Sequence, residues 1–134
     1  MGGLYIVPER EISGFDPYVN GRNLAQASDE LDALAKRLTV RPLMGFFSAH
    51  PDEVAALFDE ESGGPGLEGL ALPPEVWFEA DDGLKTVEKL LAYIADNPNA
   101  VSDSKRVVED LREFQSVLQR LSAKDVKWHL SVDN

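Results

Sequence analysis

The chain has 134 residues, of which 43% are hydrophobic and 28% charged, and its 24 acidic and 13 basic residues give a formal net charge of -11. It contains no cysteine, which excludes disulfides, thiolate metal sites and cysteine nucleophiles. The length predicts a single domain over residues 1–134, with a flexible Gly/Pro loop near 61–75. No apolar stretch approaches the roughly 20 residues of a membrane span, and the first residues lack a signal-peptide pattern. We therefore expect a cytoplasmic protein that makes no membrane contact.

The first third of the chain predicts a strand followed by a helix. The apolar run Leu4–Val7 is typical of a short strand and ends at Pro8. A helix is expected next, capped by Asn23 or Ser28 and ended by Arg41-Pro42. Its apolar residues recur at three- and four-residue steps: Leu24, Ala27, Leu31, Leu34, Ala35 and Leu38.

The middle of the chain predicts a short helix, a loop, a strand and a longer helix. Pro51 with two following acids favours a helix start, and the residues after it run into the glycine-rich loop. Val76–Ala80 reads as a strand, after which Asp81 or Asp82 is expected to cap a helix. The apolar stripe of that helix is Leu84, Val87, Leu90, Leu91 and Ile94.

The last third predicts the longest helix and a terminal strand. Ser102 is expected to open the helix, whose polar face carries Asp110 among other charged residues. Val126–Val132 alternates strictly, as a half-buried strand does, and should pair with the first strand or the Trp77 strand. The fold class is therefore α+β. A small antiparallel sheet of the N-terminal, Trp77 and C-terminal strands should pack with about four helices, the last two forming an antiparallel hairpin.

Charge is the most informative feature of the sequence. Between Arg41 and Lys85 there are ten carboxylates and no Lys or Arg, so this stretch carries -10 of the net charge of -11. Such a segment repels phosphates, which disfavours nucleic acid as a partner, and attracts basic proteins. The ten residues are Asp52, Glu53, Asp59, Glu60, Glu61, Glu68, Glu75, Glu79, Asp81 and Asp82.

Chemistry-bearing motifs are sparse. His129 would share a strand face with Lys127, Ser131 and Asp133, an arrangement best explained as the polar face of an amphipathic strand. His50, just before Pro51, has no second histidine at zinc-ligand spacing. The acidic clusters at 59–64 and 79–83 do not fit the calcium-binding EF-hand loop. We therefore expect no metal, no cofactor and no catalytic residue.

Three functions remain open. The leading hypothesis is a small acidic protein-binding module, like an immunity protein or an inhibitor, that engages a basic partner through the acidic segment. An alternative is a small enzyme or ligand-binding domain that uses His129, His50 and nearby carboxylates. The third is an oligomerising protein, which an exposed apolar patch around Leu43–Phe47 would favour. The partner-binding residues of the leading hypothesis are Asp59, Glu60, Glu61, Trp77, Glu79, Asp81 and Asp82.

Overall fold

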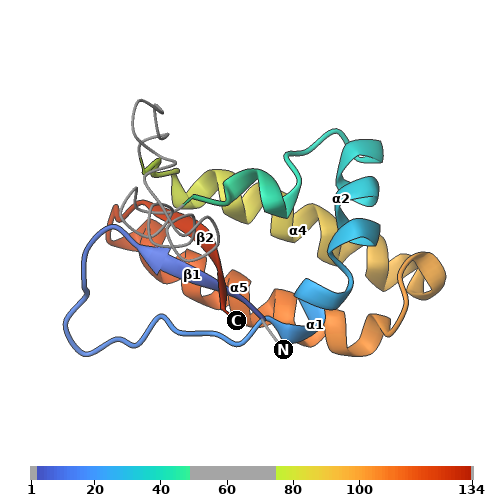
Figure 1. Cartoon of the computed structure of the whole chain (residues 1–134), viewed down its shortest axis with the longest axis horizontal. Helices are drawn as coiled ribbons and strands as arrows, with labels where there is room; N and C mark the ends of the chain where they lie inside the picture. The colour runs from blue at the N-terminus through green and yellow to red at the C-terminus, as the bar shows by residue number, and fades with distance from the viewer. Residues whose placement is uncertain (1–2, 49–74, 134) are drawn as a thin grey trace, which may run out of the picture.

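The computed structural model describes residues 3–48 and 75–133. Figure 1 shows two long helices running side by side, with the paired strands towards one end and a shorter helix towards the other. Within the described ranges the elements follow one another in this order: β1 (Gly3–Pro8), α1 (Arg22–Gln26), α2 (Ser28–Arg37), the 3-10 helix η1 (Leu43–Phe46), α4 (Ala80–Asp96), the 3-10 helix η2 (Pro98–Ala100), α5 (Ser104–Ala123) and β2 (Trp128–Asp133).

The sheet consists of β1 and β2, which pair in antiparallel fashion along their whole lengths. Ile6 pairs with Leu130, and both side chains are buried in the core. On the outer side of β2, the backbones of Phe78 and Trp128 exchange two hydrogen bonds of 2.7 and 2.9 Å. The C-terminal strand therefore meets both of its expected neighbours, but the Trp77 segment contributes one bridge rather than a third strand.

Helices α4 and α5 form the expected hairpin, joined through η2. Their starts differ from the prediction. Helix α4 begins at Ala80 with Glu79 as its N-cap, so Asp81 and Asp82 lie in its first turn instead of capping it. Helix α5 begins at Ser104, two residues after the expected start. The apolar sides of the two helices supply much of the core: Val87, Leu90, Ile94, Val107, Leu111, Phe114, Leu118 and Leu121.

The single helix expected after residue 23 is broken at Ala27 into α1 and α2. Neither Asn23 nor Ser28 is an N-cap, because Gly21 and Ala27 occupy those positions. The start of α1 is capped from α5 instead. The buried carboxylate of Asp110 accepts the backbone N–H of Asn23 at 3.0 Å and that of Leu24 at 3.4 Å. Asp110 thus does not lie on an exposed polar face, as the sequence indicated.

The α+β class, the antiparallel sheet and the helical hairpin are confirmed. The helix expected after Pro51 and the loop near 61–75 fall almost wholly outside the described residues. Within 3–48 and 75–133, no helix is both long and apolar enough to cross a membrane.

Candidate functional site

The imidazole of His129 is buried, and it does not lie on an outward polar surface as the alternation of β2 predicted. His129 is 2% exposed, and Ser131 on the same face of β2 is buried as well. Nε2 of His129 lies 2.7 Å from Oε2 of Glu75, and the rings of His129 and Trp77 have centroids 4.7 Å apart. Side chains two residues apart in an extended segment point to the same side, so Glu75 and Trp77 both face His129. They cover the face that the sequence assigned to solvent.

The hydrogen bonds of His129 suit an anchor better than a catalyst. Nδ1 lies 3.0 Å from the carbonyl oxygen of Leu130, while Nε2 contacts the Glu75 carboxylate. A general base must take a proton from a nucleophile or from water, but the described neighbours of both ring nitrogens are acceptor oxygens. His129 lines none of five well-formed hollows among the described residues. The other histidine of the enzyme hypothesis, His50, lies outside the described residues.

The start of α4 carries three exposed carboxylates, on the N-cap residue Glu79 and on Asp81 and Asp82 of the first turn. Acidic side chains are favourable here because the helix N-terminus bears a partial positive charge. This turn is fixed to β2, since the indole Nε1–H of Trp128 donates to the Glu79 carbonyl oxygen at 3.2 Å. The backbone at the start of α4 is therefore joined to β2.

These carboxylates point to two sides of the helix. Glu79 and Asp81 line a small hollow with Asp125, and Asp81 accepts the hydroxyl hydrogen of Ser122. Asp82 lines a different hollow together with Arg41 and Lys85, the two basic residues that bound the carboxylate-only stretch of sequence. Within the described residues, no group of three or more His, Asp or Glu side chains is arranged to hold a metal ion.

Of the predicted partner-binding residues, the structure describes Trp77, Glu79, Asp81 and Asp82. Trp77 is half-buried, and its ring lies beside that of His129. Asp59, Glu60 and Glu61 lie outside the described residues. Sequence reasoning missed the roles of Glu75 and Ser48. Glu75 could have been found from its two-residue spacing to Trp77, whereas no sequence signal marks the Ser48 hydroxyl, which accepts the Val76 N–H at 2.7 Å.

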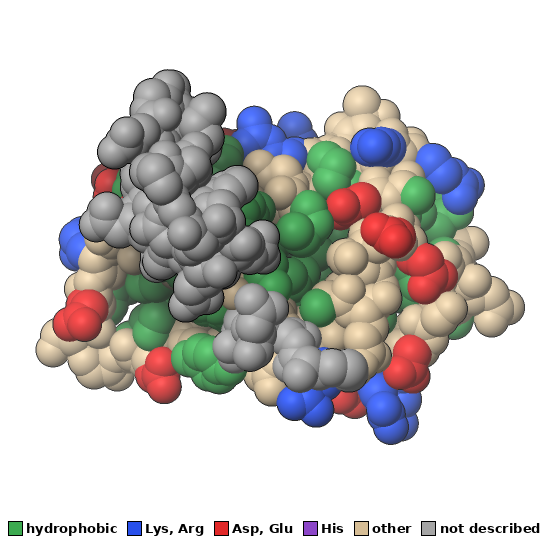
Figure 2. All heavy atoms as spheres, viewed as in Figure 1, with side chains coloured by type: hydrophobic (Ala, Val, Ile, Leu, Met, Phe, Trp, Pro, Cys, Tyr) green, Lys and Arg blue, Asp and Glu red, His purple; other side chains and the backbone are tan. Residues whose placement is uncertain are grey.

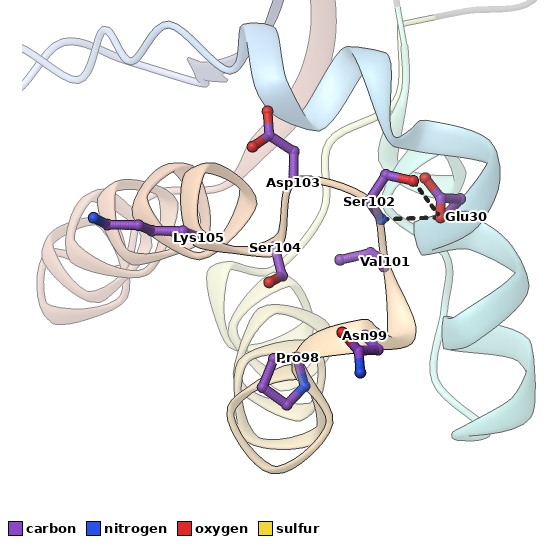
Figure 3. Close-up of a pocket in the computed structure, with 8 residues that line it drawn as sticks. All are labelled: Glu30, Pro98, Asn99, Val101, Ser102, Asp103, Ser104 and Lys105. Carbon is purple, nitrogen blue, oxygen red and sulfur yellow. Dashed lines mark hydrogen bonds between the residues drawn. The ribbon is translucent and has the colours of Figure 1, made fainter.

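An open depression of about 490 Å³ lies between α2, η2 and the start of α5. Figure 3 shows Glu30 and Ser102 facing each other there, while Lys105 points away along α5. The Glu30 carboxylate accepts both the backbone N–H of Ser102, at 3.1 Å, and its hydroxyl hydrogen, at 3.4 Å. These hydrogen bonds join α2 to the turn between η2 and α5.

Surface charge on the face shown in Figure 2 is mixed: Lys and Arg side chains alternate with Asp and Glu, and hydrophobic surface lies between them. Comparisons with known protein families, with curated proteins and with solved structures found no match.

Proposed function

We propose that the chain is a small acidic protein-binding module that engages a basic protein partner through its middle segment, in the manner of an immunity protein or an inhibitor. One observation carries the proposal: the stretch between Arg41 and Lys85 holds ten carboxylates without a single Lys or Arg. A surface of one charge sign accelerates association with partners of the opposite sign and disfavours other partners.

The described part of the segment supports this proposal in two ways. Glu79, Asp81 and Asp82 are exposed, so their charges are available to a partner. They also stand on a helix start that is packed against the fully buried Trp128, so little conformational order has to be created on binding. The remaining predicted contact residues, Asp59, Glu60 and Glu61, are part of the proposal on sequence grounds alone.

The test compares two variants of equal net charge. The first neutralises the start of α4 with Glu79→Gln, Asp81→Asn and Asp82→Asn. The matched control removes three exposed carboxylates from elsewhere with Asp96→Asn, Glu109→Gln and Glu113→Gln. Each protein is immobilised, basic proteins of the native cell extract are captured, and a captured protein is purified for affinity measurements.

We expect the first variant to bind the purified partner about tenfold more weakly than the control variant, because local charge contacts are lost in addition to net charge. Binding to the unmodified chain should also weaken as NaCl rises from about 50 to about 500 mM. Equal affinities of the two variants, or binding that is insensitive to salt, would contradict the proposal.

A further inference from the structure

Both ring nitrogens of His129 face acceptor oxygens. Nε2 lies 2.7 Å from Oε2 of Glu75, and Nδ1 lies 3.0 Å from the carbonyl oxygen of Leu130. An imidazolium has two N–H donors and can bond both oxygens, whereas a neutral imidazole has one donor and one lone pair. Whichever nitrogen of the neutral ring lacks the proton, its lone pair faces an oxygen lone pair. Both contacts are therefore complete only when the ring is charged.

Two side chains of one segment contact this ring. The Glu75 carboxylate is 23% exposed and the His129 side chain 3% exposed, so the pair is largely shielded from water. The centroid of the Trp77 ring lies 4.7 Å from that of the imidazole, within the roughly 6 Å over which a cation is attracted to an aromatic ring. The carboxylate and the indole thus hold a charged ring more tightly than a neutral one.

The remaining attachments of this segment do not depend on a proton. The N–H of Val76 donates to the hydroxyl of Ser48 at 2.7 Å, and the backbones of Phe78 and Trp128 exchange two hydrogen bonds. Amides, carbonyls and hydroxyls keep their protons between about pH 5 and 8, the range in which histidine ordinarily changes charge. The contact with His129 is therefore the one on which pH can act.

Other titratable groups lie on the same side of the sheet as the imidazole. Side chains of their types do not ordinarily change charge between about pH 5 and 8. Alternation along β1, β2 and the segment before α4 places these described groups on that side: Tyr5, Glu9, Glu79 and Lys127. A response to pH over that range is therefore assigned to His129.

We infer that His129 is a pH-sensitive latch: its imidazolium holds Glu75 and Trp77 against β2, and loss of the ring proton releases both side chains. As pH rises through the histidine range, a carboxylate and an indole from the acidic stretch become available at the surface. This inference does not depend on the proposed function, because it concerns contacts within the chain.

Acrylamide quenching of tryptophan fluorescence measures the release, because the chain has two tryptophans and Trp128 is fully buried, so quenching reports on Trp77. The unmodified chain is compared from about pH 5.5 to 8.5 with the variants His129→Gln and Glu75→Gln. Glu79→Gln is the matched control, because it removes an exposed carboxylate four residues further along the same segment.

We expect the quenching constant of the unmodified chain to rise about twofold with pH, as the half-buried indole of Trp77 becomes exposed. Glu79→Gln should show the same rise. His129→Gln should show none because its amide does not titrate, and Glu75→Gln should show none because an amide can accept from the charged ring and donate to the neutral one.

Nitrogen chemical shifts of the imidazole identify the group that titrates. They are read in a His50→Gln chain, in which His129 is the only histidine. We expect two protonated ring nitrogens at about pH 5.5 and one at about pH 8.5, with the change at the same pH as the rise in quenching.

Four results would overturn the inference: a quenching constant of the unmodified chain that does not change with pH, a rise that persists in His129→Gln, a ring that is already neutral at about pH 5.5, and a loss of helical circular dichroism over the same range. The last would mean that the whole chain unfolds. If His129→Gln does not fold, Glu75→Gln provides the comparison, and a rise as large as that of Glu79→Gln would overturn the inference.

Discussion

Asp32, on α2, is a carboxylate whose ionisation the fold opposes. Burial raises its pKa above the ordinary value of 3.8, the N–H of Met44 lowers it, and the neighbouring Asp29 raises it further. Within the described residues, Oδ1 of Asp32 has no hydrogen-bond partner. A carboxylate with an incompletely satisfied oxygen is costly to bury in its charged form.

Asp32→Asn should therefore change the pH dependence of stability. Because the folded state binds the Asp32 proton more tightly than the unfolded state, stability is fully retained below pH 3.8 and is lost as pH rises through the higher folded pKa. Asparagine does not titrate, so the variant should gain on the unmodified protein as pH rises, by less than about 1 kcal/mol for a partly exposed group. Urea denaturation from about pH 3.5 to 7 measures this difference. Parallel stability curves would contradict the expectation. Asp96→Asn, at an exposed position away from Asp32, is the control.

The burial of two polar residues could not be predicted from the sequence. Asp110 and His129 each occupy a position that local periodicity assigns to a polar face, yet both are buried. Asp110 is satisfied by the first N–H groups of α1 and His129 by Glu75, partners that are 87 and 54 residues away in sequence. Periodicity reports only which residues of one element share a face, so it cannot reveal that a distant segment covers that face.

At the scale of elements, the helical hairpin was predictable because its apolar stripes are long and regular. The strand expected around Trp77 does not form, and its segment makes a single bridge with β2. The bridge of Phe78 with Trp128 would, in antiparallel register, bring Val76 opposite Leu130. Phe47 already forms a bridge with Leu130, so the ladder cannot extend. Competition between two segments for one strand edge leaves no trace in the local pattern of either.

Gly83 sets how closely α4 approaches β2. A Cβ atom at this position would lie 2.4 Å from Cζ2 of the Trp128 indole, which is itself fully buried. In an exposed helix position, Gly→Ala would stabilise by about 1 kcal/mol. At position 83 the overlap of the added Cβ with the indole outweighs the higher helix propensity of Ala. We therefore expect Gly83→Ala to lower the free energy of unfolding by about 1–3 kcal/mol.

Urea denaturation followed by tryptophan fluorescence measures the effect of Gly83→Ala. Ala92→Gly, at an exposed position of the same helix, calibrates the propensity term and should destabilise by about 1 kcal/mol. A Gly83→Ala variant that is more stable than the unmodified chain would contradict the close approach of α4 to Trp128.

At the scale of the molecule, pairing of β1 with β2 joins residues 3–8 to residues 128–133, so the sheet closes only when the two ends of the described chain meet. The acidic segment lies between Arg41 and Lys85, which line one hollow. The sequence predicted the charge of that segment and the class of the fold. The sequence could not predict that the carboxylates lie on two sides of α4, because their placement depends on how α4 packs through Gly83 against Trp128.

Net charge should also govern the stability of the whole chain. At -11, repulsion between carboxylates disfavours the compact state, and the ion pairs that salt would weaken are few among the described residues. The Arg106–Asp103 pair, for example, is 4.0 Å long with both side chains exposed, so it contributes little. Salt screening should therefore weaken the repulsion between carboxylates more than it weakens the attraction in ion pairs.

We expect the free energy of unfolding to rise by about 1 kcal/mol between about 0.02 and 0.5 M NaCl, measured by urea denaturation at constant pH. The variant with Glu79→Gln, Asp81→Asn and Asp82→Asn carries less charge and should gain less, and a free energy of unfolding that falls with salt would mean that attractive pairs outweigh the repulsion.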